Sequence, residues 1–285
     1  MRVTTIILFV LFAFACHKID ELPKNHKRKD FSLFTALERD SIAEDYNAWA
    51  NYFLQPSFAY RLYKDSANLA QPEELSYLQT KSYSYKKRGE HIEAMRILNE
   101  VVEKDVAVGS FDALQYRAWS LLYYYRDYSG ALEDLEKIEE MTDDNYTQCW
   151  GEACRFQKSQ ALYCLERYEE AIVEMQKLIE IELGKYKEVN NHLYFLYLGR
   201  CYQKLGRFKE AKKTYLKAIA LFPKFCEGYY FLGEVYEQVG EKKEAERAYL
   251  NAQRYKANKM GEPYIERFDE VFPYMIDRKL KKGNL

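Results

Sequence analysis

The chain has little glycine, proline or histidine for its length. Its 285 residues include 12 Gly, 6 Pro and 4 His, against 27 Tyr and 16 Phe. Glycine and proline interrupt regular structure, so their scarcity favours a chain built from helices. Histidine is the side chain used most often to move protons near neutral pH, so its scarcity argues against acid–base catalysis.

An excess of charge of either sign is also lacking. The chain has 43 Lys and Arg residues and 44 Asp and Glu residues, a net charge of −1. Such a balance lacks the basic surplus of a nucleic-acid-binding protein, and we expect no nucleic-acid partner. Hydrophobic residues make up 48% of the chain, which excludes wholesale disorder.

Motifs of the common catalytic and metal sites are absent from the sequence. There is no glycine-rich phosphate loop, nucleophile elbow, paired-histidine zinc helix or calcium loop. Of the four histidines, only His91 and His192 lie in the region that we expect to be folded, and we expect His91 to be a packing residue. We predict no enzymatic activity, no cofactor and no metal site.

An apolar run stands at the N-terminus. Arg2 is followed by apolar and hydroxylic residues from Val3 to Ala15. As a helix this run would span about 20 Å, less than the ~30 Å hydrocarbon core of a membrane. A basic residue, an apolar stretch and then small residues are typical of a secretory signal peptide, which we assign to residues 1–15. An uncleaved anchor is an alternative.

Cleavage after residue 15 would leave Cys16 at the start of the mature chain. This placement resembles the lipobox of bacterial lipoproteins, although Ala13 stands where that family usually has leucine. The resemblance implies that Cys16 is lipidated, with palmitate for example, and anchors an exported protein in the envelope, in the outer membrane facing the periplasm or the exterior. An ordinary signal in which Cys16 has no role is an alternative. Residues 16–37 are predicted to be a flexible tether.

The sequence repeats itself from residue 192 onward, with a period of 34 residues. The apolar residues of each copy are three or four apart, which places them on one helix face, and a glycine marks a helix end. Each copy is therefore predicted to be a helical hairpin. The matching pairs are Leu198 and Leu232, Gly199 and Gly233, Tyr202 and Tyr236, Gly206 and Gly240, Ala211 and Ala245, Tyr215 and Tyr249, and Ala218 and Ala252.

This pattern resembles the tetratricopeptide repeat (TPR), a helical hairpin of 34 residues. Two helices that pack closely need small side chains where they approach and large ones where the grooves open. The structural signature positions of the two clearest copies are Gly199, Ala211, Gly233 and Ala245. The alanines that hold the equivalent place in looser, earlier copies are Ala94, Ala131 and Ala171.

The resemblance implies an all-α fold, a right-handed α-solenoid of about five to six TPR hairpins with a C-terminal capping helix. The solenoid is predicted over residues 38–285, with approximate repeats at 41–70, 75–108, 111–145, 152–185, 192–225 and 226–259, and a cap at 262–282 kinked near Pro273. Unequal spacing of the signature alanines predicts extra residues in loops at 142–145 and 184–191.

By the same resemblance, the first helix of each hairpin lines a concave, partner-binding surface. Its central positions are aromatic, which suits a peptide or a flat sugar ring. The predicted binding residues are Tyr83, Lys86, Trp119, Tyr123, Phe156, Tyr163, Leu196, Arg200, Lys204, Tyr230, Glu234 and Glu237. Two alternatives stay open, because many tyrosines only fill space between helices and the basic positions can pair with the acidic ones on the next repeat.

Five cysteines follow Cys16, an odd number that cannot pair completely within one chain. Cys149 and Cys154 flank a loop and could form a disulfide in an oxidising compartment. The other three fall on predicted helices, where we expect buried free thiols. These are Cys164, Cys201 and Cys226.

Three functions are consistent with this sequence. The first is a non-enzymatic interaction scaffold or adaptor of the cell envelope, which binds a protein or peptide on the concave surface. The second is a glycan-binding accessory lipoprotein, because Tyr and Trp rings also suit sugars. The third is a self-assembling spacer.

Overall fold

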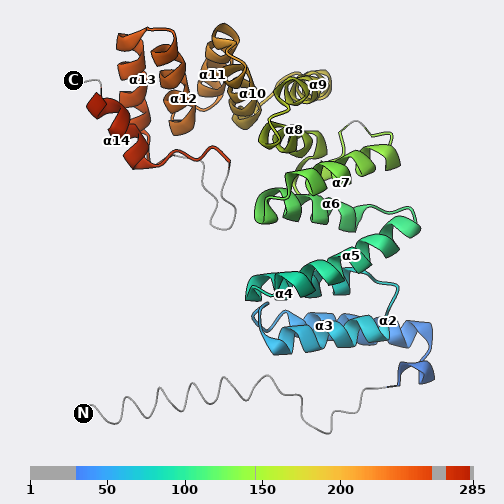
Figure 1. Cartoon of the computed structure of the whole chain (residues 1–285). Coiled ribbons are helices and arrows are strands. Elements are labelled where there is room, and N and C mark those ends of the chain that lie inside the picture. Colours follow the sequence, from blue (N-terminus) through green and yellow to red (C-terminus); the bar gives the residue numbers. More distant parts are fainter. Residues whose placement is uncertain (1–29, 145, 259–267, 283–285) are drawn as a thin grey trace, which may run out of the picture. The chain divides into compact units, whose positions relative to one another are not determined.

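The computed structural model describes residues 30–144, 146–258 and 268–282 (Figure 1). The predicted signal peptide at 1–15, the predicted lipidation site Cys16 and the tether up to residue 29 lie outside these residues. The chain divides into two compact units, Met1–Ala113 and Leu114–Leu285. Among the described residues, no helix has the length and apolar character needed to cross a membrane.

The described part of the first unit is a series of helices, each packed against the next. Its first α-helix begins with a capping box, in which Thr35 and Glu38 each bind the other's backbone N–H. The end of the predicted tether is therefore already helical. The elements are η1 (Phe31–Leu33), α2 (Ala36–Ala50), α3 (Phe58–Ala70), α4 (Ser76–Arg88) and α5 (His91–Ala107).

The second unit continues the pattern of antiparallel helix pairs. Each helix from α7 to α14 packs against the next one along the chain. Helix α10 also contacts α8 and α12, so these alternate helices share one side of the unit (Figure 1). The elements are α6 (Asp112–Trp119), η2 (Ser120–Tyr125), α7 (Tyr128–Met141), α8 (Cys154–Cys164), α9 (Tyr168–Tyr186), α10 (His192–Lys204), α11 (Phe208–Leu221), α12 (Cys226–Gln238), α13 (Lys242–Arg254) and α14 (Pro273–Lys282).

A left-handed backbone residue turns the chain between the two helices of each hairpin from α4 onward. Gly89, Gly206 and Gly240 fill this position in three turns, with φ of 82°, 71° and 81°. Arg126 and Glu166 fill it in the other two, both with φ of 61°. Glycine adopts this conformation without steric cost, whereas other residues do so at a cost. The two exceptions explain why the sequence pattern is weaker in the corresponding hairpins.

Gly199 and Gly233 occupy the same place in successive hairpins. A β-carbon on Gly199 would lie 2.6 Å from the ring of Tyr215, and one on Gly233 would lie 2.6 Å from the ring of Tyr249. Each tyrosine is buried and comes from the second helix of the same hairpin. The second-helix signature residues Ala211 and Ala245 are buried as well. The helices therefore approach too closely for any larger side chain at either glycine.

The prediction of an all-α chain of helical hairpins with a C-terminal helix is confirmed. Most of the buried hydrophobic side chains of the second unit form one cluster that extends from Leu122 in η2 to Ile276 in α14. The C-terminal helix begins at Pro273 instead of being kinked there, because proline lacks an N–H and its fixed φ suits the first helical position. Residues 268–272 are not helical, and 262–267 of the predicted cap lie outside the described residues.

Two further expectations were wrong. Gly184 lies inside α9, which extends to Tyr186, so the extra residues form a shorter loop than predicted. His91 is the first residue of α5 and is exposed, because the first turn of that helix projects beyond its packed face.

The third hairpin contains an irregularity that the sequence did not predict. In the other four turns a backbone N–H binds the carbonyl five residues earlier, as Arg207 does with Tyr202 at 2.8 Å. After η2 the N–H of Asp127 binds the carbonyl of Leu121, six residues earlier, at 2.9 Å. The π-helical turn of η2 thus absorbs one extra residue without breaking the helix.

Candidate binding surface

The first helices of the hairpins in the second unit are α6 with η2, α8, α10 and α12. We call the surface that they share the first-helix face. Most of the predicted binding residues come from these helices, whereas Tyr83 and Lys86 belong to α4 in the first unit. There the Lys86 ammonium lies 5.1 Å from the centre of the Tyr83 ring. Burial, with the charge of Lys87, lowers the pKa of Lys86 to about 8.

The predicted residues lie at different depths. Phe156 and Leu196 are fully buried, and Phe156 packs against Tyr194 at a centroid distance of 4.8 Å. Trp119 is half-buried and meets Tyr123 edge to face at 5.9 Å, so these two side chains share one stripe across the π-helical turn. The remaining tyrosines of the set, Tyr163 and Tyr230, are buried, and Lys204 is exposed.

The segment just before α14, which begins with Phe268 and Asp269, lies on the first-helix face (Figure 1). The ring of Phe268 stacks on Tyr123 at 5.8 Å. It also meets the rings of Tyr128 and Tyr197 edge to face, at 5.7 and 6.2 Å. The Arg126 guanidinium lies 5.1 Å from the centre of the Phe268 ring. Side chains from η2, α7 and α10 and from the η2–α7 turn therefore surround this phenyl group.

The next residue, Asp269, forms a buried ion pair. Arg200 of α10 donates from Nη2 to Asp269 Oδ1 at 3.1 Å. Arg200 also donates to Gln203 Oε1 at 3.0 Å and lies 4.1 Å over the ring of Phe231. Burial is the largest single influence and disfavours the charge of Arg200, but Asp269, Tyr215 and Tyr163 together outweigh it, so the pKa of the guanidinium is well above its usual value.

The environment of this ion pair affects the neighbouring groups. Burial raises the pKa of the Cys164 and Cys201 thiols to about 12, and the Asp269 charge adds to this effect. Burial raises the pKa of the Tyr163 hydroxyl as well, although Arg200 opposes the shift. All three groups are therefore neutral at physiological pH. Arg200 and Asp269 supply the charge at this place.

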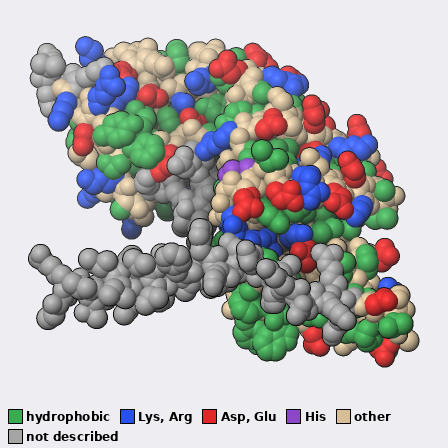
Figure 2. Space-filling view, turned by 60° about the horizontal axis from the view of Figure 1, so that its bottom comes forward, with side chains coloured by type: hydrophobic (Ala, Val, Ile, Leu, Met, Phe, Trp, Pro, Cys, Tyr) green, Lys and Arg blue, Asp and Glu red, His purple; other side chains and the backbone are tan. Residues whose placement is uncertain are grey.

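Helix α14 covers the end of the first-helix face. Lys279 lies 3.5 Å from Glu234 Oε1 and 2.6 Å from Glu237 Oε2, both on α12. Arg200 lies 3.8 Å from Glu234, as expected for charge pairing between neighbouring hairpins. Tyr230 lines a depression of about 390 Å³ between α12 and α14. Elsewhere, side chains of both signs are interspersed over the visible surface (Figure 2).

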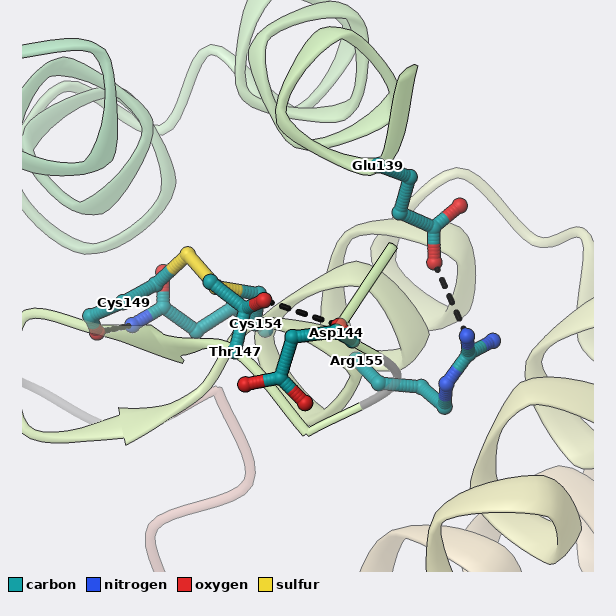
Figure 3. Close-up of a disulfide and its surroundings, with 7 residues drawn as sticks. Glu139, Asp144, Thr147, Cys149, Cys154 and Arg155 are labelled. Carbon is teal, nitrogen blue, oxygen red and sulfur yellow. Dashed lines mark hydrogen bonds and ion pairs between the residues drawn. A yellow bond between two sulfur atoms is a disulfide. The ribbon is translucent and has the colours of Figure 1, made fainter. Parts of the chain in front are cut away.

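A disulfide between Cys149 and Cys154 closes the loop ahead of α8 (Figure 3). The loop contains a small antiparallel hairpin, β1 (Gln148–Cys149) and β2 (Glu152–Ala153), which the sequence did not predict. The Tyr123 hydroxyl donates to Glu152 Oε2 at 2.6 Å and so connects the hairpin to the first-helix face. The helix cysteines lie outside this disulfide, as expected: Cys201 and Cys226 are buried, and Cys164 is half-buried.

Sequence reasoning missed Asp269 and treated Phe268 only as part of a cap. The available signal was a short segment after the last repeat, residues 268–272, in which two acidic residues stand between apolar ones. Within the described residues, no group of three or more His, Cys, Asp or Glu side chains is arranged to hold a metal ion.

Residues 192–225 and 227–259, which contain α10 to α13, match the family profile of the tetratricopeptide repeat. The repeat prediction is confirmed for these two hairpins. None of the curated proteins matches the chain in sequence.

The solved structures that are similar to this one include MamA and YrrB. MamA from Desulfovibrio magneticus RS-1, from residue 41 to its end, aligns with a TM-score of 0.54 at 16% identity, covering 65% of this chain and 96% of that one. YrrB, described as a TPR protein with an unusual peptide-binding site, aligns with a TM-score of 0.54 at 15% identity, covering 78% and 98%. At these identities the likeness shows the fold alone, a solenoid of the TPR type.

Proposed function

We propose that the protein is a non-enzymatic interaction scaffold of the bacterial cell envelope, which binds a protein or peptide on the first-helix face of its second unit. The observation that carries this proposal is the seating of Phe268 and Asp269 on that face, through an aromatic enclosure and an ion pair with Arg200. A surface with this chemistry suits an extended polypeptide. The peptide-binding site named for YrrB supports the same type of ligand.

No observation favours the glycan alternative. Two tyrosine rings of the first-helix face, those of Tyr123 and Tyr197, are buried and are already in contact with Phe268. A sugar face also offers no carboxylate partner for the buried Arg200 unless the glycan is acidic.

The proposal includes export and a lipid anchor. Its support is the N-terminal order of Arg2, an apolar run and Cys16, together with the disulfide between Cys149 and Cys154. Structural disulfides persist in oxidising compartments and are rare in the bacterial cytosol. We place the anchor in the outer membrane, with the helical units in the periplasm or at the exterior.

Charge reversal on opposite sides of one hairpin tests the binding surface. Lys204 is exposed near the end of α10, about one turn beyond Arg200, whereas Lys213 is exposed on the second helix, α11. Tagged wild-type protein and the variants Lys204→Glu and Lys213→Glu are crosslinked in membrane fractions, purified and compared by mass spectrometry. We expect Lys204→Glu alone to lose most of the captured partner. Loss with Lys213→Glu and retention with Lys204→Glu would place the binding surface on the second helices.

Metabolic labelling tests the anchor separately. Cells that express the wild-type chain or Cys16→Ser are grown with labelled palmitate, and the purified proteins are compared. We expect label on the wild type only. Equal labelling of both proteins would exclude Cys16 as the lipidation site.

A further inference from the structure

The two contacts of the internal segment select for different chemical groups. Phe268 lies among three tyrosine rings with the Arg126 cation over its face, an environment that favours an aromatic ring over an aliphatic side chain. Asp269 meets Arg200, a cation that favours a carboxylate. Because the two residues are adjacent, a ligand that makes the same contacts needs an aromatic residue followed directly by an acidic one.

The ion pair between Arg200 and Asp269 is incomplete. Both side chains are buried, with 10% and 13% of their surface exposed. A single hydrogen bond connects them, from Nη2 to Oδ1. Within the described residues, Arg200 Nε and Asp269 Oδ2 are buried and have no hydrogen-bond partner. A guanidinium binds a carboxylate most strongly through two parallel hydrogen bonds, so the internal carboxylate uses only part of what Arg200 offers.

Residues after Asp269 limit how the segment can adjust. Val271 is buried, Phe272 is exposed, and helix α14 starts at Pro273. Lys279 then holds α14 to Glu234 and Glu237 of α12. A separate peptide is free of these constraints and can present its carboxylate to both Nε and Nη2 of Arg200. The internal segment has the advantage of high effective concentration, and the external ligand has the advantage of better geometry.

We propose that Phe268 and Asp269 are an internal competitor, and that the partner binds through an extended segment in which an aromatic residue is followed directly by Asp or Glu. This inference rests on the proposed function, because it specifies the ligand class of the same surface. Release of the internal pair would open the aromatic enclosure and free Arg200 for the partner. The internal pair thereby lowers the apparent affinity of every ligand of this surface by the same factor, so that only ligands with a high intrinsic affinity bind at low concentration.

A peptide copied from the chain itself serves as the probe. It has the sequence of residues 268–275, Phe-Asp-Glu-Val-Phe-Pro-Tyr-Met, carries fluorescein, and is titrated with the full chain in detergent while anisotropy is measured. The double variant Phe268→Ala/Asp269→Ala vacates both contacts. The matched control Phe272→Ala/Asp277→Ala removes the same residue types from exposed positions nearby. We expect the first variant to bind the peptide about tenfold more tightly than the wild type, and the control to match the wild type.

Altered peptides test the ligand class without changing the protein. Replacing the first residue of the peptide by Ala, or the second by Asn, should each weaken binding to the Phe268→Ala/Asp269→Ala variant about tenfold, a change of about 1.4 kcal/mol. In the same variant, Arg200→Gln should have the effect of the Asn peptide, and Lys213→Gln, an exposed position on α11, should have none. Circular dichroism confirms that each variant is folded.

Two results would overturn the inference. Equal affinity of the wild type and the Phe268→Ala/Asp269→Ala variant for the peptide would exclude internal competition. Equal affinity of that variant for the original, Ala and Asn peptides would exclude the aromatic–acidic ligand class. In both cases the proposed function would still be decided by the Lys204→Glu and Lys213→Glu crosslinking, so the two failures are distinguishable.

Discussion

The close approach of paired helices predicts opposite effects for the same substitution at two helical glycines. A β-carbon at Gly199 would lie 2.6 to 3.0 Å from three atoms of the Tyr215 ring, while one at Gly184 in α9 would have no atom within 4 Å. Tyr215 cannot move aside easily, because it is fully buried and its hydroxyl donates to Gln203 Oε1 at 2.7 Å. Overpacking of this kind costs about 1–3 kcal/mol.

The two variants share the same change of residue inside a helix, and only Gly199→Ala creates the close contact. Gly→Ala inside a helix is intrinsically stabilising by about 1 kcal/mol at both positions. Gly184→Ala should therefore raise the free energy of unfolding. The free energy of unfolding of Gly199→Ala should be about 1–3 kcal/mol lower than that of Gly184→Ala. Urea denaturation followed by circular dichroism measures both values. Equal stabilisation by the two substitutions would refute the steric explanation of the repeat glycines.

Three further predictions concern stability. Burial raises the pKa of Cys201 to about 12 in the folded chain. The stabilising effect of this thiol is therefore complete below about pH 9 and is lost as the pH rises toward 12. Between about pH 8 and pH 10, urea denaturation should show a fall in the free energy of unfolding that is about 1 kcal/mol smaller in Cys201→Ala than in the wild type. Cys149→Ser/Cys154→Ser should lower the free energy of unfolding by about 2 kcal/mol, and unchanged stability would mean that the bridge does not form. Glu166→Gly should raise it by about 1 kcal/mol, because Glu166 holds a left-handed backbone with φ of 61°.

The sequence predicts those features of the fold that recur in every hairpin. The contact of Gly199 with Tyr215 returns as that of Gly233 with Tyr249, so the same steric demand leaves the same residues 34 positions later. The turn glycines also recur, and a turn is hard to recognise in the sequence only where Glu166 or Arg126 adopts the positive φ in place of glycine. A packing requirement that recurs in each hairpin can therefore be detected as a repeat in the sequence.

Features that occur once leave no such pattern. Asp269 lies 69 residues from Arg200, and the contact has no counterpart in the other hairpins. The π-helical turn in η2 depends on one inserted residue, which hydrophobic periodicity does not locate. Pro273 fits both a kink and a helix start, and the choice depends on tertiary packing of α14 against α13. The sequence therefore predicts which helices form the first-helix face, but it does not predict the contact of Phe268 and Asp269 with that face.

Site-specific photocrosslinking in cells tests the assignment of the binding surface most directly. A benzophenone amino acid is introduced in place of Lys204 on the first-helix face or in place of Lys213 on α11, and adducts are detected after irradiation. If the partner binds the first-helix face, a discrete adduct should form from position 204 and none from position 213. An adduct from position 213 alone would contradict this assignment.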